Sequence, residues 1–405
     1  MKLLCISNGH GEDAIALRIL QQLRALPHAP ELAAMSLVGE GSAYTHANIP
    51  LIGPAKRLPS GGFIYMDGRQ LARDLQGGLV ALTLAQLRTV KAWAQEGGAV
   101  LAVGDIVPLL FAWYGGAPYA FVGTAKSEYY LRDEAGVLPR PTWFDRLENL
   151  WGSVYLPWER WLMEHPRCRA VYPRDRLTAD TLRRWDLPVF DLGNPMMDGL
   201  EPTGDLELPP HGNPLTLLLL PGSRPPEVYT NWQIILEGVE SLLARSPAPL
   251  MFLGAIAPSL DPDPLHHALT ERGWQRRANG RYFQRSQSTL LLDQAHFGDC
   301  LHRADVALAM AGTATEQFVG LGKPAFIYPG PGPQFTPAFA EAQTRLLGPS
   351  AILVKHPHHT ADAVDRLMHD PDRLQLIADN GDRRMGQPGA AARIADSVMT
   401  QLYNI

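Results

Sequence analysis

Short runs of apolar residues alternate with longer amphipathic segments along most of the chain. The apolar runs have the length of strands and are nearly continuous, which is typical of strands buried on both faces of a parallel sheet. In the first half they predict strands at residues 2–7, 31–39, 99–105, 118–124 and 168–175. Helices are predicted after several of these strands, for example at residues 13–26 and 176–185. This alternation indicates an α/β fold with helices on both faces of the sheet.

The alternation stops at residues 187–214, a segment rich in Pro and Gly that we interpret as a linker. It then restarts, with strands predicted at residues 215–220, 249–256, 288–294, 304–310 and 323–330. We therefore predict two α/β domains of similar size, residues 1–190 and residues 191–384. The last amphipathic stretch, about residues 391–403, is predicted to be a closing helix.

The composition narrows the class of protein. Of the 405 residues 46% are hydrophobic and 19% are charged, so the chain is an ordinary globular one. The net charge of −5 argues against a nucleic-acid partner. The three cysteines are far apart and form no disulfide framework or zinc spacing, which favours a reducing compartment. The N-terminal apolar run is too short for a signal peptide, and no run is long enough to span a membrane. We expect a cytoplasmic protein, or one that also rests on the inner membrane surface.

The first candidate site is the loop after the first predicted strand, with the sequence Asn8-Gly9-His10-Gly11-Glu12-Asp13. Ligands of open α/β sheets bind at the carboxyl ends of strands. Glycine allows the backbone to approach a ligand closely, and a histidine is a candidate base near neutral pH. The alternative is a helix N-terminus at which Asp13 is favourable whatever the function. The loop lacks the third glycine of a dinucleotide-binding fingerprint.

Asp105 is the second candidate, because it ends a strongly apolar strand on the same edge of the sheet. A carboxylate in this position is either a general base or a cap of the next helix, and the sequence favours neither.

The third candidate is Pro221-Gly222-Ser223-Arg224, followed by Glu227, directly after a buried strand. Gly222 and Ser223 offer a tight turn with free amides, and Arg224 offers a fork of donors that suits a phosphate. The alternative is a solvated turn with a surface arginine.

The fourth candidate is Gly312-Thr313 with Glu316 and Gln317, where a strand gives way to a helix. A helix N-terminus with exposed amides binds anions, above all phosphate. A carboxylate one turn later can accept hydrogen bonds from a pair of ribose hydroxyls. The alternative is a capping box with Thr313 as N-cap and Glu316 as its partner.

Aromatic residues are frequent at residues 141–163, among them Trp143, Trp151, Trp158 and Trp161. Mixed with Arg and Glu they suit a membrane interface or a lipid acceptor. The alternative, which the sequence slightly favours, is that they pack between helices.

In this order the motifs resemble the glycosyltransferase B (GT-B) architecture. More narrowly, they resemble lipid-A-disaccharide synthase and its uncharacterised relatives in cyanobacteria and plastids. The segment LLLLPGSRPPEV is similar to the family's L-L-P-G-S-R-x-x-E motif, and AMAGTATEQ to its S-G-T-A-x-L-E motif. LGNPMMDG resembles G-H-x-M-x-D, AVLAVGD the strand that ends in an essential aspartate, and SLVGEGSAYTHANIP the glycine-rich turn after the second strand. The resemblance covers nearly the whole chain.

The resemblance implies two Rossmann-like domains facing a cleft, with a C-terminal helix (residues 385–405) that returns to the N-terminal domain. The C-terminal domain would bind a UDP-sugar without a metal or other cofactor. Arg224 would meet the diphosphate, and Glu316 the ribose. The other donor-binding residues would be Asn194, Gly222, Ser223, Gly312, Thr313 and Gln317. Gly9, Gly11 and Glu12 would lie on the acceptor side.

The sequence departs from the family in the acceptor half. The first loop of the family reads G-E-T-S-G-D, and its aromatic S-x-W-A-W segment is replaced here by GTAKSEYYLRDE. A histidine in the first loop is more similar to other members of the architecture, such as the transferase that makes the second peptidoglycan lipid intermediate.

We therefore predict a glycosyltransferase that uses a nucleotide-sugar donor and a lipid-linked or small glycan acceptor, with His10 or Asp105 as the base. Two alternatives remain: a UDP-sugar 2-epimerase, and a non-catalytic protein that binds nucleotide sugar.

Overall fold

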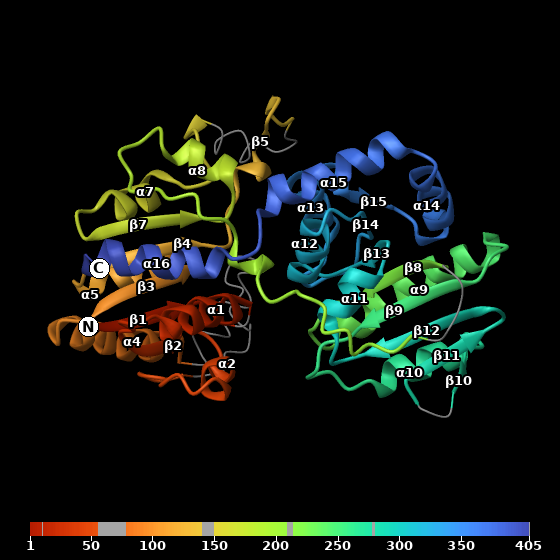
Figure 1. The fold of residues 1–405 in the computed structure, drawn as a ribbon, viewed down its shortest axis with the longest axis horizontal. Coiled ribbons are helices and arrows are strands. Elements are labelled where there is room, and N and C mark those ends of the chain that lie inside the picture. The colour runs from red at the N-terminus through yellow and green to blue at the C-terminus, as the bar shows by residue number, and fades with distance from the viewer. Residues whose placement is uncertain (10, 56–77, 140–149, 209–213, 278–279, 405) are drawn as a thin grey trace. The chain divides into compact units, whose positions relative to one another are not determined.

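A computed structural model of the protein describes residues 1–9, 11–55, 78–139, 150–208, 214–277 and 280–404. The chain forms two compact units (Figure 1). Unit 1 contains Met1–Asp198 and Gly386–Ile405, and unit 2 contains Gly199–Met385. The sequence analysis placed the first boundary earlier, after residue 190. The segment up to Asp198 belongs to unit 1 because the Asp198 carboxylate accepts hydrogen bonds from the N–H groups of Gly389 (2.5 Å) and Ala391 (2.6 Å), at the start of the last helix.

Unit 1 is built on a five-stranded parallel sheet with the strand order β2-β1-β3-β4-β7. Its strands are almost fully buried, as their apolar sequences predict. Their bounds are Lys2–Ser7 for β1, Glu31–Ser36 for β2, Ala99–Gly104 for β3, Tyr119–Gly123 for β4 and Cys168–Pro173 for β7.

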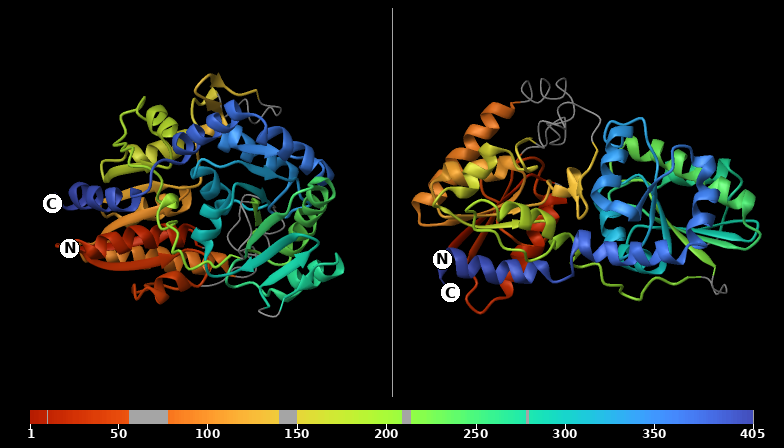
Figure 2. Two further views of the ribbon diagram at one scale, coloured as in Figure 1. Left: turned by 45° about the vertical axis from the view of Figure 1, so that its right-hand side comes forward. Right: turned by 90° about the horizontal axis from the view of Figure 1, so that it is seen from above.

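Helices cover both faces of this sheet. Helix α1 packs against the C-terminal helix α16, and α4 packs against α5; Figure 2 shows α16 and α4 on opposite sides of the sheet. The hydroxyl of Tyr403 in α16 donates to the carbonyl oxygen of Lys2 (2.7 Å), which fixes the end of the chain on unit 1. The helices are α1 (Gly11–Ala25), α2 (Ser42–His46), α4 (Leu79–Gln95), α5 (Ile106–Gly115), α7 (Pro157–Glu164), α8 (Arg176–Leu182) and α16 (Ala390–Tyr403).

Unit 2 contains an eight-stranded sheet with the order β10-β11-β12-β9-β8-β13-β14-β15. The strands from β12 to β15 are parallel, whereas β10 and β11 add an antiparallel edge that the sequence analysis did not predict. The bounds are Leu215–Leu220 for β8, Leu250–Ala255 for β9, Gln275–Arg276 for β10, Tyr282–Arg285 for β11, Ser288–Asp293 for β12, Val306–Ala309 for β13, Ala325–Ile327 for β14 and Ala351–Leu353 for β15.

The helices of unit 2 pack on this sheet around fully buried side chains such as Trp232, Phe252 and Tyr328. Burial of such a large apolar side chain stabilises a fold by about 1.5–3 kcal/mol. The helices are α9 (Glu227–Arg245), α10 (Asp263–Glu271), α11 (Phe297–Arg303), α12 (Thr313–Gly320), α13 (Pro337–Leu347), α14 (Thr360–Met368) and α15 (Pro371–Met385).

The strand order of each unit reverses at one point. In unit 1 the chain passes from β1 to β2 on one side and later to β3 on the other side of β1. In unit 2 it passes from β8 to β9 on one side and later to β13 on the other. The crevice outside the carboxyl ends of two such strands is where open α/β sheets bind ligands. The fold therefore points to the loops after β1 and β3, and to the loops after β8 and β13.

Candidate functional site

The switch point of unit 2 brings the third and fourth candidate segments together. Strands β8 and β13 are paired, with Leu220 opposite Ala309, so the loops that follow them leave the sheet side by side. The pairing extends one step further, because the N–H of Met310 donates to the carbonyl oxygen of Leu220 (2.8 Å). The sequence predicted both loops as parts of one site, and the sheet brings them together.

The loop after β8 contains a glycine that the backbone requires. Gly222 has φ +99°, and a Cβ atom there would lie 3.3 Å from the carbonyl oxygen of Met310 in the neighbouring loop. Ser223 is exposed and Arg224 is half-buried. The guanidinium of Arg224 donates to the side-chain oxygen of Gln334 (2.9 Å), so Arg224 is held at the switch point and is not a freely solvated arginine.

The loop after β13 leads into α12, which begins at Thr313 with Gly312 as its N-cap. The N-cap is Gly312 and not Thr313, so the alternative of a capping box with Thr313 as N-cap is wrong, and no side-chain cap hydrogen bond is present among the described residues. The first N–H groups of a helix have no partner within the helix and attract anions. Thr313 is exposed at this end, while Glu316 and Gln317, one turn later, are buried.

A third loop, at residues 328–336, completes this end of unit 2, and sequence reasoning did not single it out. It follows β14, the neighbour of β13. The buried carboxylate of Glu227 accepts hydrogen bonds from the N–H groups of Gln334 (3.0 Å) and Phe335 (2.6 Å). Glu227 begins α9, so it ties the third loop to the first. The Gly-Pro-Gly-Pro run after a strand was the signal in the sequence that could have marked this loop.

Two buried amide side chains lie behind the three loops. Asn231 of α9 donates to the carbonyl oxygens of Pro221 (3.1 Å) and Met310 (3.4 Å). Gln343 of α13 donates to the carbonyl oxygen of Ala311 (3.1 Å). The sequence does not predict these contacts, because two of the three acceptors, Met310 and Ala311, lie 79 and 32 residues along the chain from their donors.

Asn194 was predicted to bind the donor, but it belongs to unit 1 and the other predicted donor residues belong to unit 2. It is buried, and its side-chain oxygen accepts a hydrogen bond from the N–H of Met196 (3.1 Å). In this position Asn194 caps the short 3₁₀ turn Pro195–Met197.

In unit 1 the loops after β1 and β3 also meet. Gly9 has φ +117°, and a Cβ atom there would lie 2.1 Å from the carbonyl oxygen of Val38, so only glycine fits. A Cβ atom on Gly104 would lie 3.0 Å from the side chain of Asn8, which places the ends of β1 and β3 in contact. His10, the predicted base, lies outside the described residues.

The remaining residues of the first loop form the start of α1. Gly11 is its first residue, and the N–H of Glu12 donates to the carbonyl oxygen of Gly9 (3.1 Å). Asp105 caps α5: one of its carboxylate oxygens accepts from the N–H of Val107 (2.8 Å). Of the two roles that the sequence allowed for Asp105, that of a helix cap is therefore present. Its role as a base stays a prediction.

Asp13 is more than a favourable charge at a helix start. Its buried carboxylate accepts hydrogen bonds from the hydroxyls of Ser7 (2.5 Å) and Ser36 (2.9 Å), and Ser7 in turn contacts the hydroxyl of Tyr44 (2.5 Å). Burial raises the pKa of Asp13, although the hydrogen bonds from Ser7 and Ser36 oppose this rise. The network joins the ends of β1 and β2 directly beside the first loop. Only the fold reveals it, because its members are dispersed over residues 7–44.

The segment that departs from the resembled family holds buried charges. Glu128 forms an ion pair with Arg132 (2.8 Å) and accepts from the hydroxyl of Ser153 (2.5 Å). Burial raises the pKa of the Glu128 carboxyl. Lys126 pairs with the buried Glu159 of α7 (2.5 Å). These contacts hold together the region that follows β4.

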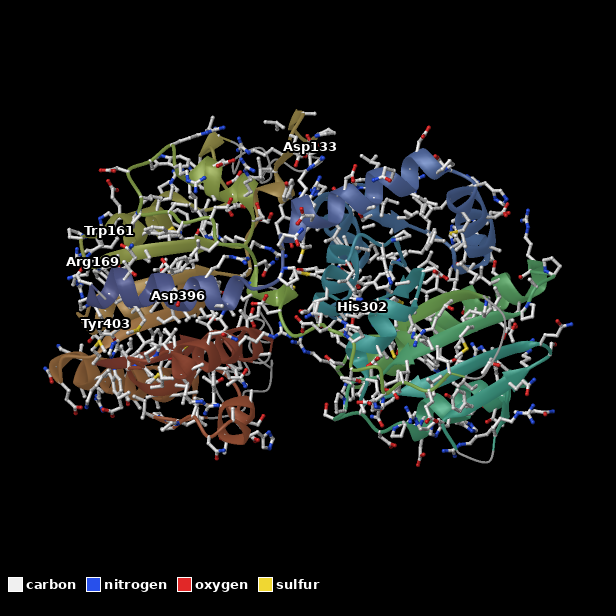
Figure 3. All side chains as sticks on the ribbon, viewed as in Figure 1. Asp133, Trp161, Arg169, His302, Asp396 and Tyr403 are labelled. Atoms are coloured by element: carbon white, nitrogen blue, oxygen red, sulfur yellow. The ribbon has the colours of Figure 1, made fainter. Side chains whose placement is uncertain are left out.

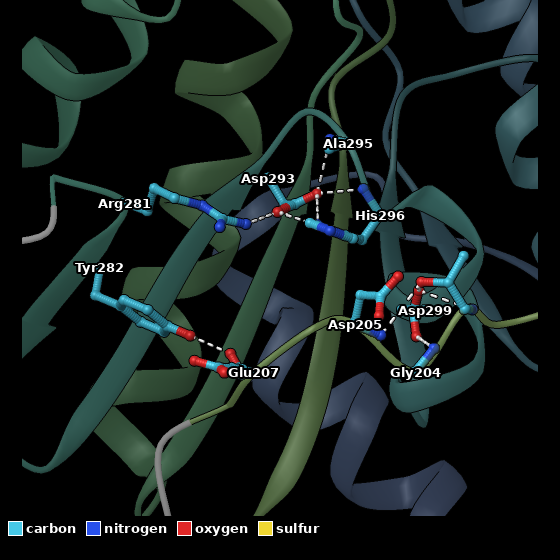
Figure 4. A network of polar contacts seen from close by, with 10 residues as sticks. Gly204, Asp205, Glu207, Arg281, Tyr282, Asp293, Ala295, His296 and Asp299 are labelled. Atoms are coloured by element: carbon cyan, nitrogen blue, oxygen red, sulfur yellow. Dashed lines mark hydrogen bonds and ion pairs between the residues drawn. The ribbon is translucent and has the colours of Figure 1, made fainter.

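Unit 2 contains a second polar cluster at the end of β12, two strands away from the switch point (Figure 4). Asp293 accepts hydrogen bonds from the N–H of Ala295 (2.8 Å) and the ring of His296 (3.0 Å), and it pairs with Arg281. Asp299 accepts from the N–H of Gly204 (2.7 Å), which fastens the segment that enters unit 2. These carboxylates fix loop and helix starts, and the sequence analysis did not single them out.

The ranges that the structure describes show no metal site: no group of three or more His, Cys, Asp or Glu side chains within them is arranged to hold a metal ion. Among the helices of those ranges, none is long and apolar enough to cross a membrane.

Comparison with known proteins identifies the fold. No protein-family model matches the chain, and no curated protein matches it either. Solved structures do match over the full length. MurG of Acinetobacter baumannii is 14% identical, with 98% of this chain and 99% of that chain covered and a TM-score of 0.55. The calicheamicin glycosyltransferase CalG4 is 16% identical (100% and 98% covered, TM-score 0.59).

The UDP-GlcNAc 2-epimerase of Neisseria meningitidis, solved with UDP-GlcNAc, is 14% identical (99% and 100% covered, TM-score 0.55). The chain therefore has the GT-B fold, as predicted, with a Rossmann-like sheet in each unit. This fold is shared by glycosyltransferases and by UDP-GlcNAc 2-epimerases.

Proposed function

We propose that this protein is a glycosyltransferase that moves a sugar from a UDP-sugar to an acceptor hydroxyl. One observation carries the proposal: the switch point of unit 2 combines an uncapped helix N-terminus, a glycine turn and a fixed arginine in loops that leave the sheet side by side. This combination suits a diphosphate, which needs both hydrogen-bond donors and positive charge. The GT-B fold is consistent with it.

The donor site in this proposal consists of unit 2 residues. Arg224 binds the diphosphate together with the backbone amides at Gly222, Ser223, Gly312 and Thr313. Glu316 accepts the ribose hydroxyls, and Gln317 lies beside it on α12. Asn194 is kept as a donor residue only through the resemblance, since its own contacts are those of a cap.

The reaction is a substitution at the anomeric carbon of the donor sugar. The acceptor oxygen forms the new bond to this carbon, and the bond to the diphosphate oxygen breaks. UDP leaves with the electron pair, and Arg224 with the helix amides stabilises the charge that develops on it. The acceptor proton passes to His10 or to Asp105. One carboxylate oxygen of Asp105 caps α5, and the other has no hydrogen-bond partner among the residues that the structure describes.

The acceptor in this proposal is lipid-linked, as the resemblance to lipid-A-disaccharide synthase suggests, and the protein works in the cytoplasm at the inner membrane surface. The exposed apolar side chains of α5 and α7 in unit 1, called the aromatic face below, support the proposed contact with a membrane. Large side chains stand exposed on α5 and α7: Leu110 (44%), Tyr114 (48%), Trp158 (50%) and Trp161 (53%). Trp161 and Arg169 lie at the outer surface of the unit (Figure 3).

Three basic residues, Arg88 and Lys91 of α4 and Arg169 of β7, are exposed on elements that pack against α5 or α7. Aromatic side chains with flanking basic residues favour the surface of an anionic bilayer. Trp143, which the sequence analysis grouped with these tryptophans, lies outside the described residues.

Calorimetric binding of UDP and a panel of UDP-sugars tests the donor assignment. We expect the wild type to bind UDP, and Arg224→Ala and Glu316→Ala to lose this binding because they remove the diphosphate and ribose partners. Arg345→Ala, which removes an arginine paired with Glu341 on α13 of the same unit, is the matched control and keeps it. A wild type that binds no uridine nucleotide contradicts the proposal.

A second candidate function is a UDP-sugar 2-epimerase, which the match to the Neisseria enzyme favours. The two activities differ in their need for an acceptor. Incubation with UDP-GlcNAc alone, followed by NMR, distinguishes them: an epimerase forms the 2-epimer of the intact donor, whereas a glycosyltransferase leaves the donor sugar unchanged until an acceptor is added. A protein that binds the donor and does neither is the non-catalytic alternative.

A further inference from the structure

We propose that Asn231 and Gln343 are positioning residues, which turn the backbone amides of the donor loops outward toward the diphosphate. This inference rests on the proposed function and extends it to two residues that make no contact with the donor in the proposal.

The two side chains come from different helices and act on adjacent loops. Asn231 is 3% exposed and donates to the carbonyl oxygens of Pro221 and Met310, one from each loop. Gln343 is 1% exposed and donates to the carbonyl oxygen of Ala311. Three carbonyl groups of the donor loops are therefore held toward the interior of unit 2. Since each amide nitrogen faces carbonyl oxygens, the orientation of both side chains is defined by their partners.

Peptide geometry then decides where the N–H groups point. A trans peptide is planar, and its C=O and N–H point in opposite directions. The peptides that follow Pro221, Met310 and Ala311 are trans. Their N–H groups, which belong to Gly222, Ala311 and Gly312, are therefore turned away from the buried amides. In the part of the chain that the structure describes, none of these three N–H groups has a hydrogen-bond partner.

A purely structural role explains the two amides less well. The side-chain oxygens of Asn231 and Gln343 are buried and have no partner among the described residues. A buried polar atom without a partner is unfavourable, so such atoms are rare unless they serve a function. Asn380 of α15 provides the comparison within the same unit. It is equally buried, donates to the carbonyl oxygen of Leu347 (2.7 Å) and to Ser350 (2.8 Å), and leaves no buried side-chain atom unpaired.

The arrangement has a consequence for binding. If Asn231 is replaced by an apolar residue of similar size, the carbonyls of Pro221 and Met310 lose this inward donor, and their peptide planes are less restrained. Replacement of Gln343 removes one of two donors to the carbonyl oxygen of Ala311, since the hydroxyl of Thr315 also donates to it (2.6 Å), so the smaller effect is expected there. The outward N–H groups are then no longer preorganised, and a diphosphate must order them as it binds. Arg224 and the helix α12 remain in place, so binding is weakened and not abolished.

The test uses Asn231→Leu and Gln343→Met in the full chain, with Asn380→Leu as the matched control. Binding of UDP, inorganic diphosphate and uridine is measured by calorimetry, and thermal unfolding of each variant is recorded. Loss of residues that orient the ligands of a metal ion commonly weakens metal binding about 10- to 100-fold, and we take the same order of magnitude for residues that orient the loop amides. We expect this change in Kd for UDP and for inorganic diphosphate in both positioning variants. Uridine lacks the diphosphate, so its affinity stays unchanged.

The control separates positioning from stability. Asn380→Leu loses two buried hydrogen bonds and lowers the Tm, yet we expect it to keep the wild-type Kd for UDP. If Asn231→Leu does not fold, Gln343→Met alone decides the question. Positioning variants that bind UDP and diphosphate as tightly as the wild type overturn the inference, and so does a control that weakens binding to the same extent.

The outcomes also separate this inference from the proposed function. A wild type that binds inorganic diphosphate but not UDP refutes the uridine donor, while the diphosphate measurements still decide the role of Asn231 and Gln343. A wild type that binds neither overturns both.

Discussion

Glu227 links the loop after β8 to the loop at residues 328–336 in the proposed donor site, and the hydrogen bonds that it accepts allow the effect of its replacement to be estimated. Its buried carboxylate accepts hydrogen bonds from the N–H groups of Gln334 and Phe335. Glu227→Ala leaves both N–H groups without their acceptor. A hydrogen bond to a charged group contributes about 1.5–3 kcal/mol, and the lower end applies here because the substitution also removes the cost of burying the carboxylate.

Hydrogen exchange measures this loss directly at the two amides. Each 1.4 kcal/mol corresponds to about a factor of ten in an equilibrium constant. A loss of about 1.5 kcal/mol per amide therefore accelerates exchange of the Gln334 and Phe335 amides about tenfold or more. Mass spectrometry of a peptide that covers residues 328–336 reports this acceleration. Because Gln334 also holds Arg224, we expect weaker UDP binding in the same variant.

Glu240→Ala is the matched control for this prediction. Glu240 lies on the same helix, but its ion pair with Arg285 is about one third exposed on both sides. Such pairs contribute about 0–1 kcal/mol, so exchange at residues 328–336 stays at the wild-type rate. Unchanged exchange in Glu227→Ala refutes the view that this carboxylate holds the third loop. Equal acceleration in Glu240→Ala shows that the effect is not specific to the hydrogen bonds.

Two further predictions concern unit 1. Burial raises the pKa of Asp13, so this carboxyl stabilises the fold fully below its unfolded pKa of about 4, and the contribution is lost as the pH rises through the folded value. The Tm of Asp13→Asn relative to wild type therefore increases from about pH 4 upward, and thermal unfolding of both proteins over a series of pH values checks this. A difference in Tm that shrinks as the pH rises contradicts the effect of the buried carboxyl. Replacing Trp158 and Trp161 by Ser weakens binding to anionic vesicles about tenfold or more, because each indole offers about 100 Å² of exposed surface. Sedimentation with vesicles checks this, and Leu376→Ser in unit 2 should bind as wild type does; equal binding by all three proteins excludes the aromatic face as the contact.

Much of the fold could be predicted from local patterns. The apolar runs at residues 2–7, 99–104 and 215–220 are strands, and the closing helix at residues 390–403 belongs to unit 1. A parallel strand that is buried on both faces is apolar along nearly its whole length, so a short run of consecutive apolar residues marks its position. The antiparallel edge of unit 2 was missed because β10 and β11 are short and polar, and pair only through the neighbouring strand.

The candidate site likewise has parts that the local sequence predicts and parts that it does not. Glycine turns and polar residues directly after a strand, such as Gly222, Arg224 and Gly312, are local features that the sequence alone determined. Whether Thr313 caps a helix, and which loops meet, depended on strand order and on exact helix starts. Only the tertiary structure shows that Glu227, Asn231 and Gln343 hold the loops of the proposed donor site. It also shows that Asp13 joins Ser7 and Ser36. Several of these contacts join residues far apart along the chain, such as Glu227 and Gln334 or Asn231 and Met310, and a local sequence pattern carries no information on which distant loops the sheet places side by side.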